Sequence, residues 1–184
     1  IVVGDFCLVA GDFTSPQAAD LLRNRRHGKP GLLVVPENEG WSALIRSTFL
    51  ENASPITRYA ICKDTRFDRE RLELYARSLP GDYQLGLIDQ KLYHHCMALP
   101  FARDFCSNFS CAEEYAAKGL GICALHQGEP VAGASSYSVY NGGIEIEVDT
   151  RKDYRRRGLA TACCAALILE CLNRGLYPSW DAAN

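Results

Sequence analysis

The sequence has 184 residues, of which 47% are hydrophobic and 23% are charged, and its 20 basic and 22 acidic residues leave a formal charge of −2. This length fits one large domain or two small ones, and the composition is that of a globular protein. The balanced charge disfavours a nucleic-acid surface, and the longest apolar run, residues 159–169, is too short to cross a bilayer. We therefore expect neither a nucleic-acid partner nor a membrane partner.

The nine cysteines have no regular spacing and lie mostly in apolar runs. A disulfide scaffold is normally shorter and richer in loops. We expect reduced and mostly buried thiols, which favours a cytoplasmic location. The chain shows no signal peptide, begins at Ile1 and ends at Asn184 just after an expected strand, so we expect a fragment cut at both ends.

Residues 1–80 are expected to form a small α/β domain of unknown role. Apolar runs predict strands at residues 32–35 and 56–62. Helical spacing of apolar residues predicts a helix over residues 41–49, and Asp68 is expected to cap a second helix that reaches Leu79. The Leu-Pro-Gly-Asp turn at residues 79–82 marks the expected domain boundary.

Residues 81–184 show a clearer order of elements. Strands are expected at residues 83–88, 121–126, 131–140, 144–148 and 177–180, with hairpin turns at 127–130 and 141–143. Short helices are expected at residues 89–97 and 101–105, and a capping box at 110–113 opens a third that Gly119 ends. The helix at 158–174 is apolar nearly all round, so it should be buried against a sheet.

The basic loop before this last helix has the chemistry of an anion site. Gly158 lacks a Cβ, so a ligand can approach the backbone where the helix N-terminus offers unpaired N–H groups and partial positive charge. Ala160 keeps the next turn open, Arg155 adds charge and Thr161 adds a hydroxyl. This pattern predicts a pyrophosphate site. The chain has no P-loop and no Gly-x-Gly-x-x-Gly dinucleotide motif.

The segment Arg155-x-x-Gly158-x-Ala160 resembles the Arg/Gln-x-x-Gly-x-Gly/Ala signature of the GCN5-related N-acetyltransferase (GNAT) superfamily. The element order from about Tyr83 onward also matches. The stretches GASSY, GGIEIEVDT and LYPSWDAAN, at residues 133–137, 142–150 and 176–184, are similar to a bacterial branch with an extra N-terminal α/β half. The resemblance implies an α/β (α+β) fold with a mixed central sheet, a β-meander and a buried coenzyme-binding helix. It also implies an N-acetyltransferase that uses acetyl-CoA and an amine acceptor, without a metal.

The resemblance also implies roles for individual residues. The backbone of the arginine–glycine segment would bind the pyrophosphate, main-chain groups near Asp149 and Thr150 would pair with the pantetheine arm, and the Asn184 amide would contact the coenzyme. The full implied coenzyme set is Asp149, Thr150, Arg155, Arg156, Arg157, Gly158, Leu159, Ala160, Thr161 and Asn184. In many relatives a tyrosine on the helix that follows protonates the leaving thiolate. The sequence ends before that helix, so we expect the isolated fragment to be inactive.

Candidate groups for the acyl transfer lie on the strand before the basic loop. Glu145 and Glu147 are two residues apart, so they share a face, and either can accept the amine proton. Glu145 is favoured because it lies further from the coenzyme end, although both could simply be the wet face of an edge strand. Tyr137, Tyr140 and Trp180 are expected to line the acceptor pocket or to be ordinary core aromatics.

Two other functions stay open. The chain could be a non-catalytic domain that binds or senses an acyl-CoA, or a structural α/β domain with a degenerate groove. A zinc site at His94, His95, Cys96, Cys106 and Cys111 is disfavoured, because adjacent histidines cannot easily face one metal ion. The sequence does not identify the acceptor, because a fold does not fix its substrate.

Overall fold

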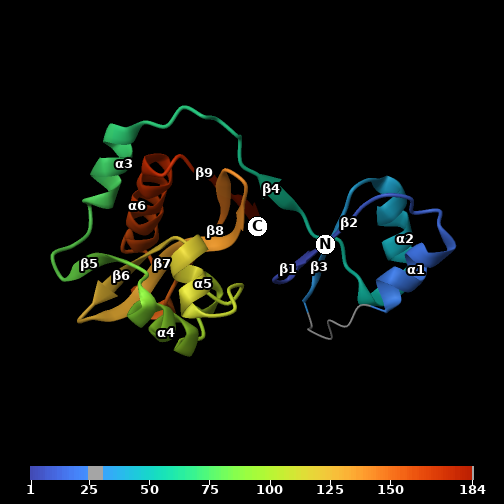
Figure 1. Ribbon diagram of the computed structural model, residues 1–184, viewed down its shortest axis with the longest axis horizontal. Coiled ribbons are helices and arrows are strands. Elements are labelled where there is room, and N and C mark those ends of the chain that lie inside the picture. Colours follow the sequence, from blue (N-terminus) through green and yellow to red (C-terminus); the bar gives the residue numbers. More distant parts are fainter. Residues whose placement is uncertain (25–30, 184) are drawn as a thin grey trace. The chain divides into compact units, whose positions relative to one another are not determined.

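The computed structural model describes residues 1–24 and 31–183, which form two compact units over residues 1–57 and 58–182 (Figure 1). By this division the boundary precedes the turn at residues 79–82 that the sequence suggested. The reason is a tertiary contact: helix α3 (Arg69–Ala76) packs against helix α6 (Leu159–Asn173) of the second unit. As expected, Asp68 caps α3, its carboxylate accepting a hydrogen bond from the Arg71 N–H at 3.0 Å.

The first unit is a three-stranded sheet with two helices. Strand β2 (Phe6–Val9) lies between β1 (Val2–Val3), which is antiparallel to it, and β3 (Leu33–Pro36), which is parallel to it. Helix α1 (Pro16–Arg23) connects β2 to β3, helix α2 (Glu39–Phe49) follows β3, and a short 3-10 turn, η1 (Leu50–Asn52), follows α2. Their common core consists of Cys7, Val9, Ala18, Leu22 and Trp41. The predicted strand at residues 32–35 and helix at 41–49 are confirmed within about two residues.

The second unit contains a five-stranded mixed sheet in the order β5-β6-β7-β8-β9. Strands β5 to β8 are antiparallel neighbours, and β9 pairs with β8 in parallel. The strands are β5 (Tyr83–Leu87), β6 (Gly121–His126), β7 (Glu129–Tyr140), β8 (Gly143–Thr150) and β9 (Tyr177–Ser179). Two shorter strands, β4 (Arg58–Ala60) and β10 (Asp181–Ala183), form a separate two-stranded sheet. This arrangement confirms the expected mixed α/β sheet.

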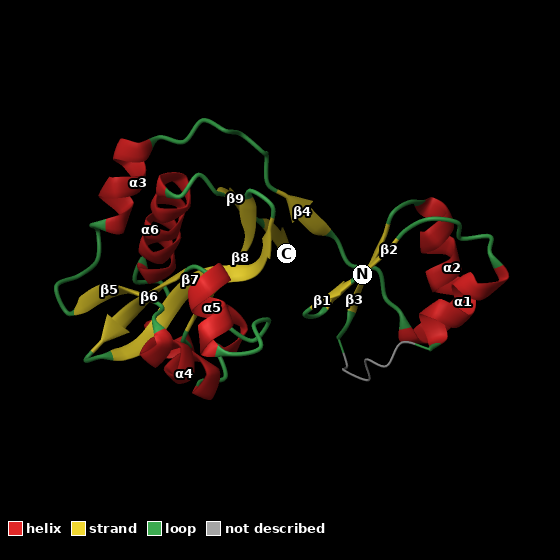
Figure 2. Cartoon of the chain, viewed as in Figure 1, coloured by secondary structure: helices red, strands yellow, loops and turns green. Residues whose placement is uncertain are grey.

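Helices cover both faces of this sheet (Figure 2). On one face α6 buries Leu159, Cys163 and Leu167 against strand residues such as Ile144 and Ile146. The other face carries α4 (Gln90–Ala98), the 3-10 turn η2 (Arg103–Phe105) and α5 (Ala112–Lys118), which bury a second core around Phe105 and Tyr115. Since side chains alternate along a strand, Glu145 and Glu147 face away from α6.

Some local predictions need correction. The capping box expected at residues 110–113 is wrong: α5 begins after Cys111, and the carboxylate that reaches back is that of Glu114, which accepts from Ser110 N at 2.8 Å and Ser110 Oγ at 2.6 Å. The strand expected at residues 56–62 is only the three residues of β4. All nine cysteines are free, and most are buried. Within the described chain, no helix has the length and apolarity needed to cross a bilayer.

The buried contacts of α6 make a stability prediction. Leu167 lies on α6 and is fully buried against the sheet, whereas Leu74 on α3 is 68% exposed. We expect Leu167→Ala to lower the free energy of unfolding by about 2–5 kcal/mol, because it removes buried methyl groups and leaves a cavity. Chemical denaturation followed by far-ultraviolet circular dichroism measures this change. The matched control, Leu74→Ala, should change stability little, and equal losses in the two variants would contradict the described packing.

Candidate functional site

The start of α6 leaves backbone donors open to a ligand. Gly158 is the N-cap and has a left-handed φ of 77°, with no side-chain capping bond. A Cβ at this position would meet nothing within 4 Å. The N–H of Ala162 donates to Gly158 O at 3.0 Å, so the N–H groups of Leu159, Ala160 and Thr161 precede the first intrahelical bond and lack a helical acceptor. The helix therefore begins at the predicted glycine, on the surface.

A groove of roughly 350 Å³ lies over this helix start. It is lined by the end of β8, the basic loop and the first turn of α6. The lining residues are Val148, Asp149, Thr150, Tyr154, Arg155, Arg156, Gly158, Leu159, Ala160 and Thr161. The structure thus brings together every residue of the sequence-predicted coenzyme set except Arg157, which is not in this lining, and Asn184, which lies outside the described residues.

The three consecutive arginines of the loop, Arg155 to Arg157, have different surroundings. Arg155 Nε donates to Thr150 O at 3.0 Å, and its Nη2 lies 3.4 Å from the Asp149 carboxylate. Arg157 donates to the Tyr83 hydroxyl at 2.8 Å and to Asp153 O at 3.0 Å. These two side chains hold the loop in shape. Arg156 has a left-handed φ of 61° and an exposed side chain that forms no hydrogen bond or ion pair with the described residues.

One edge of β8 is open beside the groove. The parallel pairing with β9 covers Gly143 to Glu145 and stops where Glu145 faces Ser179. From Ile146 to Thr150, no strand of the described chain pairs with this edge. β8 is therefore an interior strand at its start and an edge strand at its end, so a bound extended group can take the place of the missing neighbour.

Three carboxylates alternate along the face of β8 that points away from α6: Glu145, Glu147 and Asp149. Burial raises the pKa of Glu147 to about 7, and the nearby carboxylates of Asp104 and Asp149 act in the same direction. The positive charge of Arg58 opposes this rise. A carboxylate with this pKa is half protonated near neutral pH, which suits a group that must accept a proton and later release it.

The three predicted aromatic residues come from β7 and from the chain after β9. Tyr137 is the extra residue of a bulge in β7, between the register pairs of Ser136 and Ser138. Tyr140 lies at the β7–β8 turn, where its ring would be 2.5 Å from a Cβ on Gly143. Trp180 is 38% exposed between β9 and β10. The Tyr140 hydroxyl bonds to Ser179, the chain neighbour of Trp180, so Tyr140 and Trp180 both lie at the β8–β9 pairing. That all three aromatic residues line an acceptor pocket stays a prediction.

Other residues near the groove were not found from the sequence. Tyr154 lines the groove, and its hydroxyl lies 3.0 Å from His126 Nδ1. Arg151 and Arg157 stack on the same ring, with guanidinium carbons 4.3 and 5.0 Å from its centroid. His126 is 28 residues from Tyr154 in the chain, so no local pattern joins the two.

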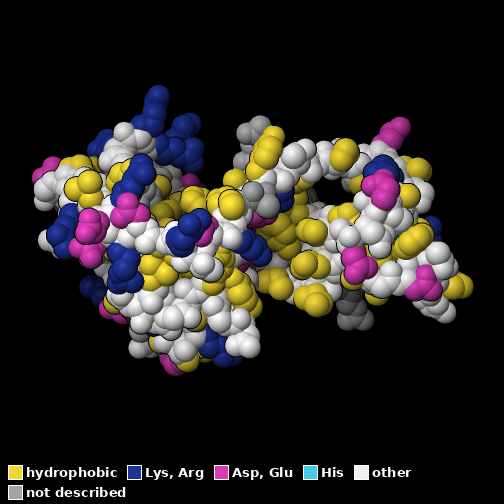
Figure 3. Space-filling model, turned by 90° about the horizontal axis from the view of Figure 1, so that it is seen from above, with side chains coloured by type: hydrophobic (Ala, Val, Ile, Leu, Met, Phe, Trp, Pro, Cys, Tyr) yellow, Lys and Arg dark blue, Asp and Glu magenta, His cyan; other side chains and the backbone are white. Residues whose placement is uncertain are grey.

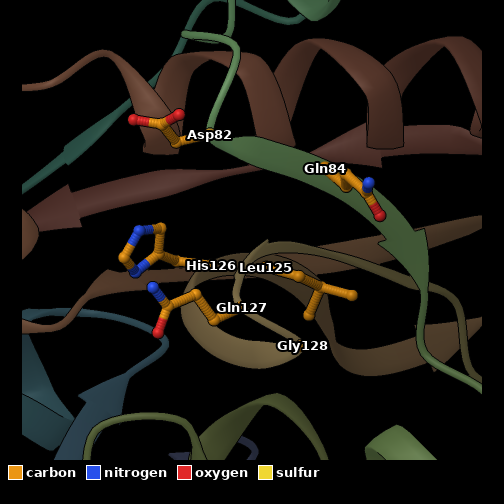
Figure 4. Close-up of a pocket in the computed structure, with 6 residues that line it drawn as sticks. All are labelled: Asp82, Gln84, Leu125, His126, Gln127 and Gly128. Atoms are coloured by element: carbon orange, nitrogen blue, oxygen red, sulfur yellow. The ribbon is translucent and has the colours of Figure 1, made fainter.

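His126 also faces a second hollow of about 480 Å³ at the side of the sheet. In Figure 4, Asp82, His126 and Gln127 gather on one side of this hollow, and Gln84 lies apart from them. None of the sequence-predicted site residues lines it.

Basic and acidic side chains both occur on the face of the second unit that Figure 3 shows. Among the described residues, no three His, Cys, Asp or Glu side chains are grouped closely enough to hold a metal ion.

Comparison with known proteins identifies the family. The sequence model of the family described as GNAT acetyltransferase matches residues 1–184, so the chain belongs to this family. Its membership supports an acyl-transfer function. The chain is 24% identical over 148 residues to an uncharacterized N-acetyltransferase, YdfB, of Bacillus subtilis (strain 168); the match covers 80% of this chain and 54% of that protein. The chain thus spans about half of this relative's length.

Solved structures agree with this assignment. A crystal structure of a GCN5-related N-acetyltransferase-like protein from Streptococcus suis 89/1591 matches with a TM-score of 0.88 and 47% identity, over 96% of this chain and 69% of that one. A GCN5-related N-acetyltransferase from Kribbella flavida matches with a TM-score of 0.51 and 18% identity, over 80% of this chain and 55% of that one. The second likeness concerns the fold alone.

The raised pKa of Glu147 makes stability depend on pH. Between pH 4.5, the ordinary glutamate pKa, and about pH 7, the Glu147 carboxyl is ionised in the unfolded chain but still protonated in the folded chain. The free energy of unfolding therefore falls as the pH rises through this window. We expect Glu147→Gln to raise the thermal unfolding midpoint relative to the unmodified protein at pH 8 and to change it little near pH 4.5. Thermal unfolding between pH 4.5 and 8 measures the difference.

The control for this measurement is Glu129→Gln, which changes an exposed glutamate at the start of β7. It should give no such pH-dependent gain. A midpoint difference for Glu147→Gln that stayed constant across the pH range would contradict the described burial of this carboxylate.

Proposed function

We propose that this member of the GNAT acetyltransferase family transfers an acetyl group from acetyl-CoA to an amine. The observation that carries the proposal is the open first turn of α6, where Gly158 exposes backbone donors to a groove. The free edge and a carboxylate of raised pKa both lie on β8, and the loop that follows β8 leads into this turn. Together they supply the binding and proton-accepting groups that such a transfer needs.

The groove offers hydrogen-bond donors and positive charge to the coenzyme. The N–H groups of Leu159, Ala160 and Thr161 and the partial positive charge of the helix start would bind the pyrophosphate oxygens. Arg156, whose side chain is exposed, would add a full positive charge. A helix start offers such donors without any side-chain rearrangement, because the backbone fixes their direction.

The free edge of β8 would bind the pantetheine arm. This arm contains amide groups, and a strand edge presents alternating backbone N–H and C=O groups at the spacing of an extended chain. The unpaired segment runs from Ile146 to Thr150 and ends in the groove, where Val148, Asp149 and Thr150 form part of the lining. An arm bound here would direct its thioester toward the middle of β8.

Bound acetyl-CoA would supply an acetyl group activated as a thioester, together with a thiolate leaving group. The amine must be neutral to attack, so the protein has to accept its proton. Glu147 is our principal candidate, because its pKa of about 7 leaves a large carboxylate fraction at neutral pH and still makes it a better base than an ordinary glutamate. Glu145, favoured from the sequence, lies on the same face two residues away and is the comparison residue.

The carboxylates around Glu147 support an amine as the class of acceptor. The residues around Glu147 include the carboxylates of Glu145, Asp149 and Asp104. Negative charges raise the local concentration of a cationic ammonium and orient it before it loses a proton. We assign no individual amine, because charge alone does not set the shape of the substrate.

Coenzyme binding is tested with two glycine variants of the same helix. We expect Gly158→Trp to abolish the acetyl-CoA binding heat measured by calorimetry on the full-length protein, because the indole would fill the seat of the pyrophosphate. Gly175→Trp is the matched control. Gly175 follows the other end of α6, has a left-handed φ of 68° and is also free of contacts within 4 Å of a Cβ, so the backbone strain is similar. Absence of binding in the unmodified protein would reject the proposal.

Catalysis is tested by the release of free thiol from acetyl-CoA in the presence of a panel of amines. We expect Glu147→Gln to lower kcat/KM by about 10²–10⁴-fold, the usual contribution of a general base, while acetyl-CoA affinity stays near that of the unmodified protein. In the unmodified protein kcat/KM should rise with pH through about 7 as Glu147 loses its proton. Glu145→Gln should have a much smaller effect.

Unchanged rates in Glu147→Gln would remove this residue from the mechanism. Tight acetyl-CoA binding without thiol release, for every amine tested, would instead indicate a non-catalytic acyl-CoA-binding protein.

A further inference from the structure

After β9 the chain diverges from β8, and an ion pair holds the diverging segment. The parallel register pairs Glu145 with Ser179, so two more residues of the same pairing would place Asp181 beside Glu147. The chain instead turns away, and residues from Asp181 onward form β10 against β4. At this point Arg58 of β4 donates from Nε to Asp181 Oδ2 at 2.7 Å and from Nη2 to Asp181 Oδ1 at 2.6 Å.

We propose that the Arg58–Asp181 ion pair is a positioning element of the acyl-transfer site, which anchors β10 on β4 and so keeps the edge of β8 free for the coenzyme arm. This inference rests on the function proposed above. The two residues are 123 positions apart, and neither belongs to the arginine–glycine motif that marks the coenzyme seat. The pair therefore links β4, which precedes α3 in the chain, to the acyl-transfer site.

The geometry of the pair gives it the rigidity that this role requires. Both hydrogen bonds are short and parallel, and an arginine–carboxylate pair of this kind fixes orientation as well as distance. The side chains of Arg58 and Asp181 are only 27% and 37% exposed, whereas the i,i+4 pair of Arg77 and Glu73 on α3 is 79% and 47% exposed. A partly buried pair is screened less by water and salt than a surface pair.

The charge of the pair also reaches the proposed base. Arg58 lowers the pKa of Glu147, against the larger effects of burial and of the carboxylates of Asp104, on η2, and Asp149, on β8. The hydrogen bonds from Arg58 hold the pKa of Asp181 below its ordinary value, so Asp181 stays ionised. Loss of Arg58 would remove this positive charge and so favour the protonated form of Glu147.

The test compares four variants of the full-length protein: Arg58→Gln, Arg58→Lys, Asp181→Asn and the exchanged double variant Arg58→Asp/Asp181→Arg. The first should raise the acetyl-CoA dissociation constant on the order of tenfold, since one broken ion pair frees β10. It should also move the acid limb of the kcat/KM profile to higher pH. Arg58→Lys keeps the charge without the bidentate geometry, so it should weaken coenzyme binding but leave the acid limb near its original position.

Asp181→Asn should weaken binding as Arg58→Gln does, and the exchanged double variant should recover most of the affinity. Arg77→Gln is the matched control and should change neither quantity, because its ion pair is on the surface of α3. Circular dichroism verifies folding of each variant. If Arg58→Gln does not fold, Arg58→Lys and Asp181→Asn carry the same comparison.

The failures of the two proposals are distinguishable. An unmodified protein that binds no acetyl-CoA overturns the proposed function and this inference with it. An unmodified protein that binds and turns over, beside Arg58→Gln and Asp181→Asn variants with unchanged dissociation constant and pH profile, overturns the positioning role alone.

Discussion

The unpaired N–H groups at the beginning of α6 are the constraint on which the second unit depends. Every α-helix has such groups, and they are normally capped by a side chain or by water. Here Gly158 provides no side chain, and the preceding loop is held back by the bonds of Arg155 to Thr150 and of Arg157 to Tyr83. The donors therefore remain exposed in a groove, and the protein keeps them in one direction by burying the rest of the helix.

This burial explains the composition of α6. A helix that must not move relative to the sheet needs contacts along most of its length, and Leu159, Cys163, Leu167 and Cys171 are all nearly inaccessible. Small residues such as Ala162 allow the helix to approach the strands closely. The same packing presses on β8 from one side, and the charged residues of β8 are thereby left on the opposite side. The packing of α6 on the sheet thus positions both the proposed coenzyme-binding turn and the carboxylates of β8.

The sequence predicted well those features that depend on neighbouring residues. The start of α6 at Gly158, the alternation of β8 and the glycine-containing turns are local patterns, and the structure has them where they were expected. The features that it predicted poorly depend on distant contacts. α3 was placed with the first unit because the Leu79–Asp82 turn looked like a boundary, but its partner α6 is much later in the chain. Glu145 and Glu147 are alike in sequence, and what distinguishes Glu147 in the structure is its burial and the charge of Asp104, which is distant in the chain.

The short parallel pairing of β8 with β9 has a consequence for the behaviour of the protein in concentrated solution. A strand edge with unsatisfied backbone groups can template pairing with a strand of another molecule, and natural sheets limit this hazard with short edges and charged side chains. The unpaired edge of β8 spans only Ile146 to Thr150 and carries the carboxylates of Glu147 and Asp149. Its short length and its negative charge are both features that disfavour pairing with another strand, and protonation of Glu147 below about pH 7 would remove part of that charge.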